Sequence, residues 1–284
     1  MPELPEVEVI ARGLRARLVG HVLENVRLLR RDVLWRRIPD FENKLEGRRA
    51  AAVVRRGKYL LLRLSGGLTL LVHLGMTGRL WLADEAEPPA PHTHFRAGLA
   101  GLPLELRLRD PRRFGGMDLF STAREAGHPR LVRVAPDPFQ MPAPEFAERI
   151  RARHAPIKAV LLNHSVVGGL GNIYADESLW AARIHPLARA DMLKRPRLVA
   201  LHGALLAVLE RAIAFGGSSI SDFVDHLGAP GYFQNEHRVY GRAGRPCPRC
   251  GRTLARAIVA QRGTTFCPRC QRLATARDSH QLSE

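Results

Sequence analysis

The chain begins Met1-Pro2-Glu3-Leu4-Pro5-Glu6-Val7-Glu8, and this stretch predicts how the first domain opens. Apolar residues then recur at helical spacing, at Val7, Ile10, Leu14 and Leu18. Gly20 follows them as a natural C-terminal stop. Glutamates in the first turn suit the positive end of the helix dipole. The stretch therefore predicts an amphipathic helix of about fifteen residues.

The same stretch offers chemistry at its second residue. A small residue after Met1 normally leads to removal of that methionine, and Pro2 would then carry a free secondary amine. An α-amine titrates at about 7.7–8.0, so part of it is an unprotonated nucleophile that can form a Schiff base. Glu3 is placed to act as a general acid or base beside it. Alternatively, the terminus is inert and its prolines only begin a helix.

The composition indicates a polyanionic partner. The 284 residues include 44 Lys and Arg against 27 Asp and Glu, which gives a formal net charge of +17. Such an excess favours nucleic acid first and an anionic membrane surface second. No apolar run approaches the ~18 residues of a membrane span, and no signal peptide opens the chain. We therefore expect a cytoplasmic protein with no membrane partner.

The first half of the chain has the pattern of a β domain. Its strand-like runs are short, rich in Val and Leu, and separated by turn signals such as Ser65-Gly66-Gly67. Regular spacing of this kind predicts a β-sandwich or barrel behind the leading helix. The runs are 21–30, 49–55, 59–64, 68–74, 80–82, 104–109 and 117–120.

The second half changes to a helical pattern. Four prolines between Ala135 and Pro144 predict a linker between domains. Beyond it, helices are expected at 145–154, 157–164, 176–183 and about 198–213. The polar end of the chain, 274–284, is expected to be a disordered tail.

All four cysteines fall in two Cys-x-x-Cys pairs with sixteen residues between them. This is the spacing of a zinc ribbon, in which four thiolates leave no open coordination position. Disulfides are the alternative, and a reducing cytosol disfavours them. We predict one structural Zn²⁺, held by Cys247, Cys250, Cys267 and Cys270.

Several side chains are candidates for contact with the polyanion. Lys58 is one of only four lysines, at the head of an apolar strand, and lysine can lose its proton in a site where arginine cannot. Met76 lies in a glycine-rich turn and is either a core plug or a wedge between bases. Arg112 and Phe114 share a second loop, suited to a base edge and to stacking, or simply to solvent.

Weaker signals lie elsewhere in the chain. His92 belongs to a His-x-His pair that could bind metal or phosphate. The turn ending at Asn172 joins two helices and could present N–H groups to phosphate. Arg262 lies between the two cysteine pairs, at the expected tip of a hairpin, in a module whose many arginines suit a DNA-contacting finger.

Together these pieces resemble one family, the bacterial formamidopyrimidine-DNA glycosylases, which repair oxidised purines. The resemblance runs from Met1 to about Arg272. It rests on Met1–Glu8, Arg56–Tyr59, His73–Gly78, Asp110–Gly115, Ile157–Lys158, Gly171–Glu177, Pro230–Phe233 and the cysteine module.

The resemblance implies an α+β fold in four parts. These are an N-terminal catalytic β-sandwich with its leading helix (1–135), a helical domain with a helix–two-turn–helix (136–235), a zinc-finger hairpin (236–273) and the tail (274–284). It also implies a monomer that binds double-stranded DNA containing oxidised bases.

The resemblance further implies a mechanism. The enzyme flips the damaged nucleotide out of the duplex, Pro2 attacks the sugar, and Glu3 is the acid–base partner. The Schiff base then permits β- and δ-elimination, assisted by Lys58 and Arg262 respectively. The remaining site residues it implies contact DNA: Met76, Arg112 and Phe114 fill the gap left by the flipped base, and His92, Arg153, Lys158 and Asn172 contact DNA or the lesion.

Two alternatives stay open. The endonuclease VIII type uses the same chemistry on oxidised pyrimidines, but its N-terminus typically carries Gly where this chain has Leu4. A non-catalytic zinc-finger protein that only binds damaged DNA is the other, and it would need neither Pro2, Glu3 nor Lys58.

Overall fold

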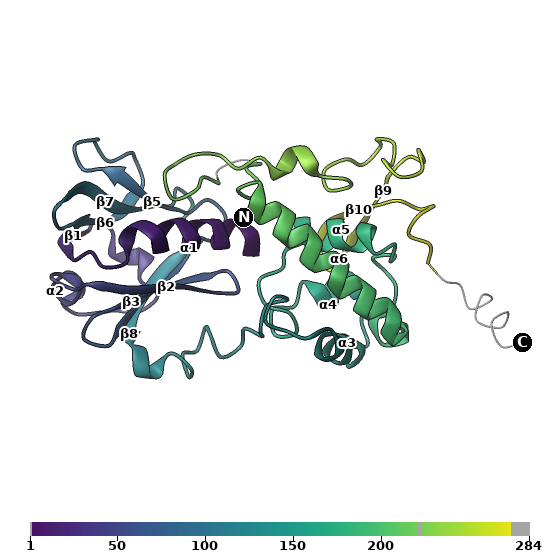
Figure 1. Ribbon diagram of the computed structural model, residues 1–284, viewed down its shortest axis with the longest axis horizontal. Coiled ribbons are helices and arrows are strands. Elements are labelled where there is room, and N and C mark those ends of the chain that lie inside the picture. Colours follow the sequence, from purple (N-terminus) through teal and green to yellow (C-terminus); the bar gives the residue numbers. More distant parts are fainter. Residues whose placement is uncertain (1, 221–222, 274–284) are drawn as a thin grey trace, which may run out of the picture. The chain divides into compact units, whose positions relative to one another are not determined.

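The computed structural model describes residues 2–220 and 223–273 (Figure 1). The chain forms two compact units. Unit 1 comprises Met1–Arg133 and Ala212–Gln234, and unit 2 comprises Val134–Arg211 and Asn235–Glu284. The predicted tail, 274–284, lies outside the described residues.

Unit 1 is built from two four-stranded antiparallel sheets. One has the strand order β2-β3-β4-β8 and the other β1-β6-β7-β5. The strands are β1 (Leu23–Leu28), β2 (Ala50–Arg56), β3 (Tyr59–Leu64), β4 (Leu68–His73), β5 (Arg79–Asp84), β6 (Thr93–Leu99), β7 (Leu102–Arg109) and β8 (Gly116–Ser121). The helices are α1 (Leu4–Leu18), α2 (Phe41–Leu45), and the 3-10 turns η1 (Arg31–Val33) and η2 (Thr122–Arg124).

The two sheets share one apolar core, as the alternating strand pattern predicts. Leu62 and Leu70 from one sheet and Phe95 and Leu106 from the other are fully buried in it. Helix α1 lies against β2 and β5 and buries its apolar stripe in the same core. The predicted β-sandwich with a leading helix is confirmed.

The sequence did not predict one strand of the sandwich, β6 (Thr93–Leu99). Its residues include His94, Arg96 and Gly98, so no run of apolar residues marks it. It nevertheless lies inside its sheet, between β1 and β7, and pairs with both. Hydrogen bonds to β1 and β7 satisfy the backbone N–H and C=O groups of β6. These are tertiary contacts, and the intrinsic strand propensity of the residues does not include them.

Unit 2 is mainly helical and ends in a small hairpin. Its helices are α3 (Ala143–Arg151), α4 (Ile157–Leu161), α5 (Asn172–Ala181) and most of α6 (Arg195–Ala214), with the 3-10 turn η3 (Ala190–Met192). The 3-10 turn η4 (Phe233–Glu236) spans the boundary between the two units in the sequence. The hairpin consists of β9 (Ala255–Val259) and β10 (Arg262–Phe266). No helix within the described ranges is both long and apolar enough to cross a membrane.

The proline-rich segment 135–144, predicted to be a linker, packs within unit 2 instead. The Gly168 N–H donates to the Pro136 carbonyl at 3.1 Å, and the His202 ring contacts the Pro138 carbonyl at 3.1 Å. A Cβ on Gly168 would lie 2.3 Å from the Ala135 oxygen. Prolines lack the N–H but keep the carbonyl, so the segment remains a good acceptor for neighbours. The segment Ala212–Gln234, which sequence reasoning gave to the helical domain, belongs to unit 1.

Candidate active site and nucleic-acid interface

The N-terminal segment of unit 1 is buried and held by its own glutamate. Glu3 is the N-cap of α1, and its N–H donates to Glu6 Oε2 at 2.8 Å in a capping box. The other oxygen, Oε1, accepts the Ser218 N–H at 2.8 Å. Glu3 and Glu6 are 3% and 1% exposed. Glu6 therefore fixes both the residue that follows Pro2 and a backbone segment far along the chain.

The backbone at Gly217 and Ser218 packs closely against the Glu6 side chain. Gly217 has φ +80°, and a Cβ there would lie 3.0 Å from Glu6 Cγ. Glycine adopts that backbone without strain and leaves that space, whereas residues with a Cβ rarely adopt it. Sequence reasoning gave Glu6 no role beyond the helix dipole, although its spacing from Glu3 is that of a capping box.

Lys58 lies in the two-residue turn between β2 and β3, where Arg56 pairs with Tyr59. Its side chain is only 6% exposed, which is rare for lysine. The His73 imidazole is close enough for the Lys58 charge to affect it. Burial, together with the smaller effect of the Lys58 ammonium, lowers the pKa of His73 to about 4. His73 Nδ1 accepts the Gly75 N–H at 3.1 Å, which requires an unprotonated nitrogen.

This arrangement predicts an acid-sensitive contribution to stability. Unfolded, His73 binds a proton near its ordinary pKa of 6.5; folded, it does so only near 4. The stability that depends on a neutral His73 is therefore fully present above pH 6.5. It is lost as the pH falls to 4, which lowers the free energy of unfolding by about 3 kcal/mol. Urea unfolding from pH 4 to 7 should show that loss in the wild type and not in His73→Gln. Equal pH profiles for the two proteins would contradict the assignment.

Two loops at one edge of the sandwich are fastened together by Asp110. Its Oδ1 accepts the Thr77 hydroxyl at 2.6 Å, and its Oδ2 accepts the Gly115 N–H at 2.8 Å. The loops also touch directly, because a Cβ on Gly75 would lie 2.3 Å from the Gly115 nitrogen. Asp110 is 3% exposed. A buried carboxylate with satisfied oxygens makes these loops one rigid platform.

The platform presents large side chains to solvent. Met76 is 40% and Phe114 56% exposed, and the Arg112 guanidinium lies 4.5 Å from the centre of the Phe114 ring. His92 is exposed beside them, with φ +69°, and its carbonyl accepts the Asp110 N–H at 3.1 Å. Exposed apolar side chains on a rigid loop are typical of a binding surface. The structure thus brings Met76, Arg112, Phe114 and His92 to adjoining loops.

In unit 2, the hairpin that carries Arg262 has an unusual turn. Val259 pairs with Arg262, so the tip consists of Ala260 and Gln261, both at positive φ (+49° and +58°). Arg262 is therefore the first residue of β10 rather than the tip itself, and it is exposed. Such turns normally use Asn and Gly, so the tip stores backbone strain that the rest of the hairpin must offset.

Lys158, predicted to contact DNA, is buried beneath this hairpin. Its side chain is 0% exposed, and its ammonium forms an ion pair with Asp176 Oδ1 at 2.6 Å. It also donates to Thr264 Oγ1 at 2.7 Å and to the Gly263 carbonyl at 3.2 Å. Asp176 Oδ2 accepts the Thr265 N–H at 2.9 Å. The direct DNA contact is therefore not supported, and Lys158 instead holds the hairpin onto α4 and α5.

Removing this ammonium should be costly. Burial raises the pKa of Asp176 to about 6 even with Lys158 beside it. Lys158→Met would leave that carboxyl without its counter-charge, so we expect a loss of about 3–5 kcal/mol. Thermal unfolding measures it, and hydrogen exchange should show faster exchange at Thr264 and Thr265. The double change Lys158→Met with Asp176→Asn should recover much of the loss, while the exposed Lys194→Met should be neutral. An unaffected single variant would contradict the buried pair.

The other predicted contacts of unit 2 differ in placement. The Asn172 amide donates to the Gly263 carbonyl at 2.9 Å, so it lies against the same hairpin. Arg153 is exposed just after α3, and its own N–H donates to the Ile150 carbonyl. Glu177, unremarked in the sequence, is 2% exposed and accepts the N–H groups of Arg238, Val239 and Tyr240. It anchors the entry to the cysteine module.

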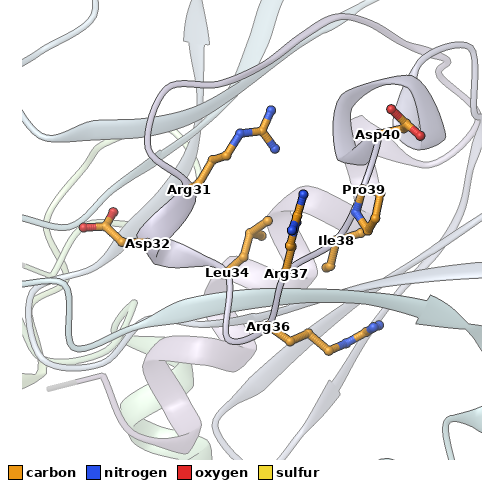
Figure 2. Close-up of a pocket in the computed structure, with 8 residues that line it drawn as sticks. All are labelled: Arg31, Asp32, Leu34, Arg36, Arg37, Ile38, Pro39 and Asp40. Carbon is orange, nitrogen blue, oxygen red and sulfur yellow. The ribbon is translucent and has the colours of Figure 1, made fainter.

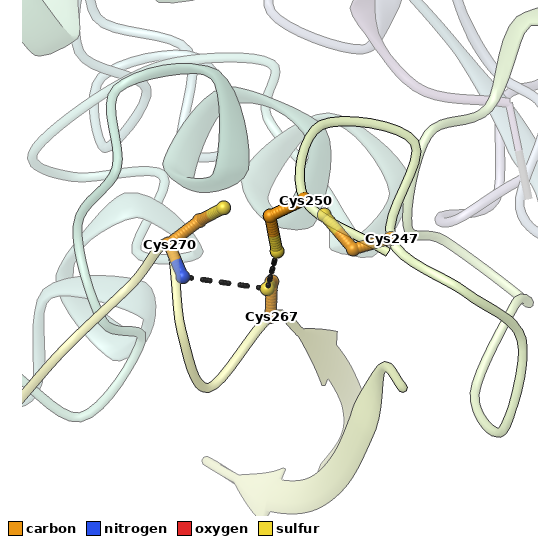
Figure 3. Close-up of side chains that lie close together, drawn as sticks. All are labelled: Cys247, Cys250, Cys267 and Cys270. Carbon is orange, nitrogen blue, oxygen red and sulfur yellow. Dashed lines mark hydrogen bonds between the residues drawn. The ribbon is translucent and has the colours of Figure 1, made fainter. Parts of the chain in front are cut away.

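The cysteines form a compact tetrad (Figure 3). Their four Sγ atoms lie within 4.8 Å of one another, and Cys250 and Cys267 are 3.5 Å apart. Tetrahedral zinc with Zn–S bonds of about 2.3 Å separates its sulfurs by about 3.8 Å, so the tetrad fits the ion. Arg249 braces the module by stacking 4.0 Å over Trp180. Within the described residues this is the one cluster suited to a metal.

Comparison with known proteins accounts for nearly the whole chain. Residues 1–117 match the formamidopyrimidine-DNA glycosylase N-terminal domain, 134–224 its H2TH domain, and 244–273 a zinc finger found in FPG and IleRS. The formamidopyrimidine-DNA glycosylase of Gluconobacter oxydans is 43% identical over 96% of this chain and 100% of its own. That of Chloroflexus aggregans is 44% identical over 95% and 98%.

The chain belongs to the formamidopyrimidine-DNA glycosylase family. Solved structures agree with this membership. A Lactococcus lactis FPG mutant in complex with Fapy-dG-containing DNA has a TM-score of 0.88, 36% identity, and coverage of 95% of this chain and 100% of that one. The Lactococcus lactis Fpg complex with abasic-site DNA scores 0.88 with 36% identity, covering 95% and 99%. As in the family's zinc-finger module, the cysteine tetrad is a site for one structural zinc.

Proposed function

We propose that this chain is a bifunctional DNA glycosylase and AP lyase of base excision repair. Its substrates would be oxidised purines, 8-oxoguanine and formamidopyrimidines, in duplex DNA. The observation that carries the proposal is the N-terminal Pro2-Glu3 pair, held by a capping box in a chain that belongs to this glycosylase family. Relatives of the same fold have been solved with Fapy-dG and abasic-site DNA.

The proposed reaction starts with a flipped nucleotide. The Pro2 amine forms a bond to C1′ of the damaged nucleotide, the C1′–N bond to the base breaks, and the base leaves with a proton. Glu3 acts as the acid–base partner of this step. The C1′–O4′ bond then breaks, O4′ takes a proton, and C1′ becomes the carbon of a Schiff base with Pro2. The Schiff base acidifies C2′, so loss of a C2′ proton expels the 3′-phosphate and a second elimination expels the 5′-phosphate. The strand is cut on both sides of the lost sugar.

Other side chains would support these steps. Lys58 assists β-elimination and holds phosphate, and Arg262 assists δ-elimination. Zinc would supply no chemistry here; it would only order the module behind the Arg262 hairpin.

The side chains on the exposed platform of unit 1 would insert into the duplex. Met76 and Phe114 would fill the space left by the flipped base, and Arg112 would address the orphaned cytosine through its fork of donors. His92, Asn172 and Arg153 would contact the DNA backbone. The positive net charge of +17 supports binding to a polyanion. We further propose a cytoplasmic monomer.

Borohydride trapping tests the proposal. The substrate is a duplex with 8-oxoguanine opposite cytosine, and the trapped peptide is identified by mass spectrometry. We expect a covalent adduct on Pro2, which would establish the nucleophile and the loss of Met1 together. An adduct on a lysine would overturn the assignment of Pro2. Tight binding without any adduct would favour a non-catalytic binder, and preferential trapping on oxidised pyrimidines would favour the endonuclease VIII type.

A further inference from the structure

A cavity of about 650 Å³ lies outside the groups assigned above, in unit 1 between Arg31 and Asp40 (Figure 2). The guanidinium groups of Arg31 and Arg37 extend to the same side, with the Asp40 carboxylate beyond them. Leu34, Ile38 and Pro39 contribute apolar lining. The cavity lining is therefore partly apolar and partly charged, with Arg31 and Arg37 among its cations.

The charges around this cavity are unevenly paired. Asp32 accepts from both Arg30 and Arg113, and Arg36 is held by Asp118 at 2.7 Å. Arg31 forms an ion pair with Glu42 at 3.3 Å.

Arg37 is the exception in this segment. It is exposed and, among residues 2–220 and 223–273, makes no hydrogen bond, ion pair or ring contact. Within the described residues, folding thus leaves the Arg37 guanidinium unpaired, and Arg31 shares its charge with a single carboxylate, that of Glu42. The cavity lining holds three arginines, Arg31, Arg36 and Arg37, against two acids, Asp32 and Asp40.

The cavity is tied to the platform that carries Arg112 and Phe114. Asp32 pairs with Arg113 of that loop. Leu34 forms a bridge with Met117 of β8, and the Trp35 N–H donates to the Met117 carbonyl at 3.1 Å. Strand β8 begins directly after the platform loop. The Arg37 guanidinium therefore belongs to the same rigid edge of unit 1.

We propose that Arg31 and Arg37 bind a backbone phosphate of the duplex, outside the damaged nucleotide. The inference rests on the proposed function, because the ion pair of Asp32 with Arg113 places the cavity beside the loop that would hold the DNA. Guanidinium forks match phosphate oxygens. Such a contact adds affinity independently of sequence and of the lesion.

The salt dependence of binding provides the first measurement. Arg37→Ala and the double change Arg31→Ala with Arg37→Ala are compared with wild type on damaged and undamaged duplexes of equal length. The binding constant K falls as salt rises, and losing one phosphate contact should make the slope of log K against log salt shallower by about 0.9. This corresponds to about a fivefold loss of affinity at about 0.15 M salt relative to about 1 M. The loss should be equal on both duplexes. Arg124→Ala, an exposed arginine elsewhere on unit 1, is the control and should leave the slope unchanged.

A second measurement locates the phosphate. Neutral methylphosphonates are placed one at a time along both flanks of the lesion. One position should weaken wild-type binding and have no further effect on Arg37→Ala, because each change removes the same contact. Single-turnover base release at saturating enzyme should stay at the wild-type rate in the variant.

The outcomes separate clearly. Coupling at one flanking position supports the proposal. An unchanged slope, or weaker binding with no coupled position, overturns it. If Arg37→Ala abolishes binding of inorganic phosphate but leaves every DNA measurement unchanged, the cavity serves a free anion and the DNA contact is overturned. Failure of the proposed function is distinct, because wild-type protein would then form no trapped adduct.

Discussion

Replacing Pro2 by Gly is expected to lower the rate of base release at least about 100-fold while leaving DNA affinity unchanged. Glycine still supplies an α-amine, so the change tests orientation rather than the presence of nitrogen. The proline ring fixes φ, and Glu3 behind it is fixed by Glu6. A glycine amine would sample many directions and only rarely face the sugar carbon.

Two matched variants make this prediction decisive. An uncleavable extra residue before Pro2 keeps the ring but converts the amine to an amide, so both base release and trapping should vanish. Glu3→Gln keeps the amine but removes the acid–base group, which should cost about 10²–10⁴ in base release. Pre-formed abasic DNA should still trap this variant. Unchanged turnover of Pro2→Gly would remove Pro2 from the mechanism.

Removal of zinc is expected to abolish DNA binding. Structural zinc sites of this type supply about 10–16 kcal/mol of folding free energy, which is as large as the stability of a whole domain. The tetrad lies at the foot of the hairpin, since Cys267 directly follows β10. Without the ion, four thiols that repel on ionisation would replace the cross-link, and the segment carrying Arg262 would lose its base.

Chelation followed by a binding titration measures this effect. Metal analysis should find one zinc per chain, and adding zinc back should restore affinity. Cys267→Ser should behave like the chelated protein, whereas Arg249→Met, which removes the stack on Trp180 but no ligand, should keep its zinc. Chelated protein that binds damaged DNA with undiminished affinity would show that the tetrad does not organise the DNA-contacting surface.

Local patterns were sufficient for much of this molecule. The apolar spacing of Val7 to Leu18 predicts α1, and the paired Cys-x-x-Cys motifs predict the tetrad, because both depend on residues close together in sequence. Most strands of the sandwich follow from their Val and Leu content. Strand β6 does not, since its neighbours rather than its composition make it a strand.

Long-range contacts could not be inferred in this way. The fastening of two loops by Asp110 joins it to Thr77, and no periodicity relates those positions. Lys158 looks like a surface cation in the sequence because its partner, Asp176, lies on a different helix. Whether such a lysine faces solvent or a buried carboxylate depends on how α4 and α5 pack. Sequence identified the important residue, and only the structure assigned its role.

The contact between Glu6 and Ser218 has a consequence for biosynthesis. It spans 212 positions of the chain. At about 5–20 residues added per second, the ribosome needs roughly 10–40 s to supply the second partner after the first. During that interval the N-terminal segment cannot reach its final packing, so it stays open to enzymes that process nascent chains. The discontinuous path of unit 1 thus leaves the N-terminal segment accessible until the residues around Ser218 have been synthesised.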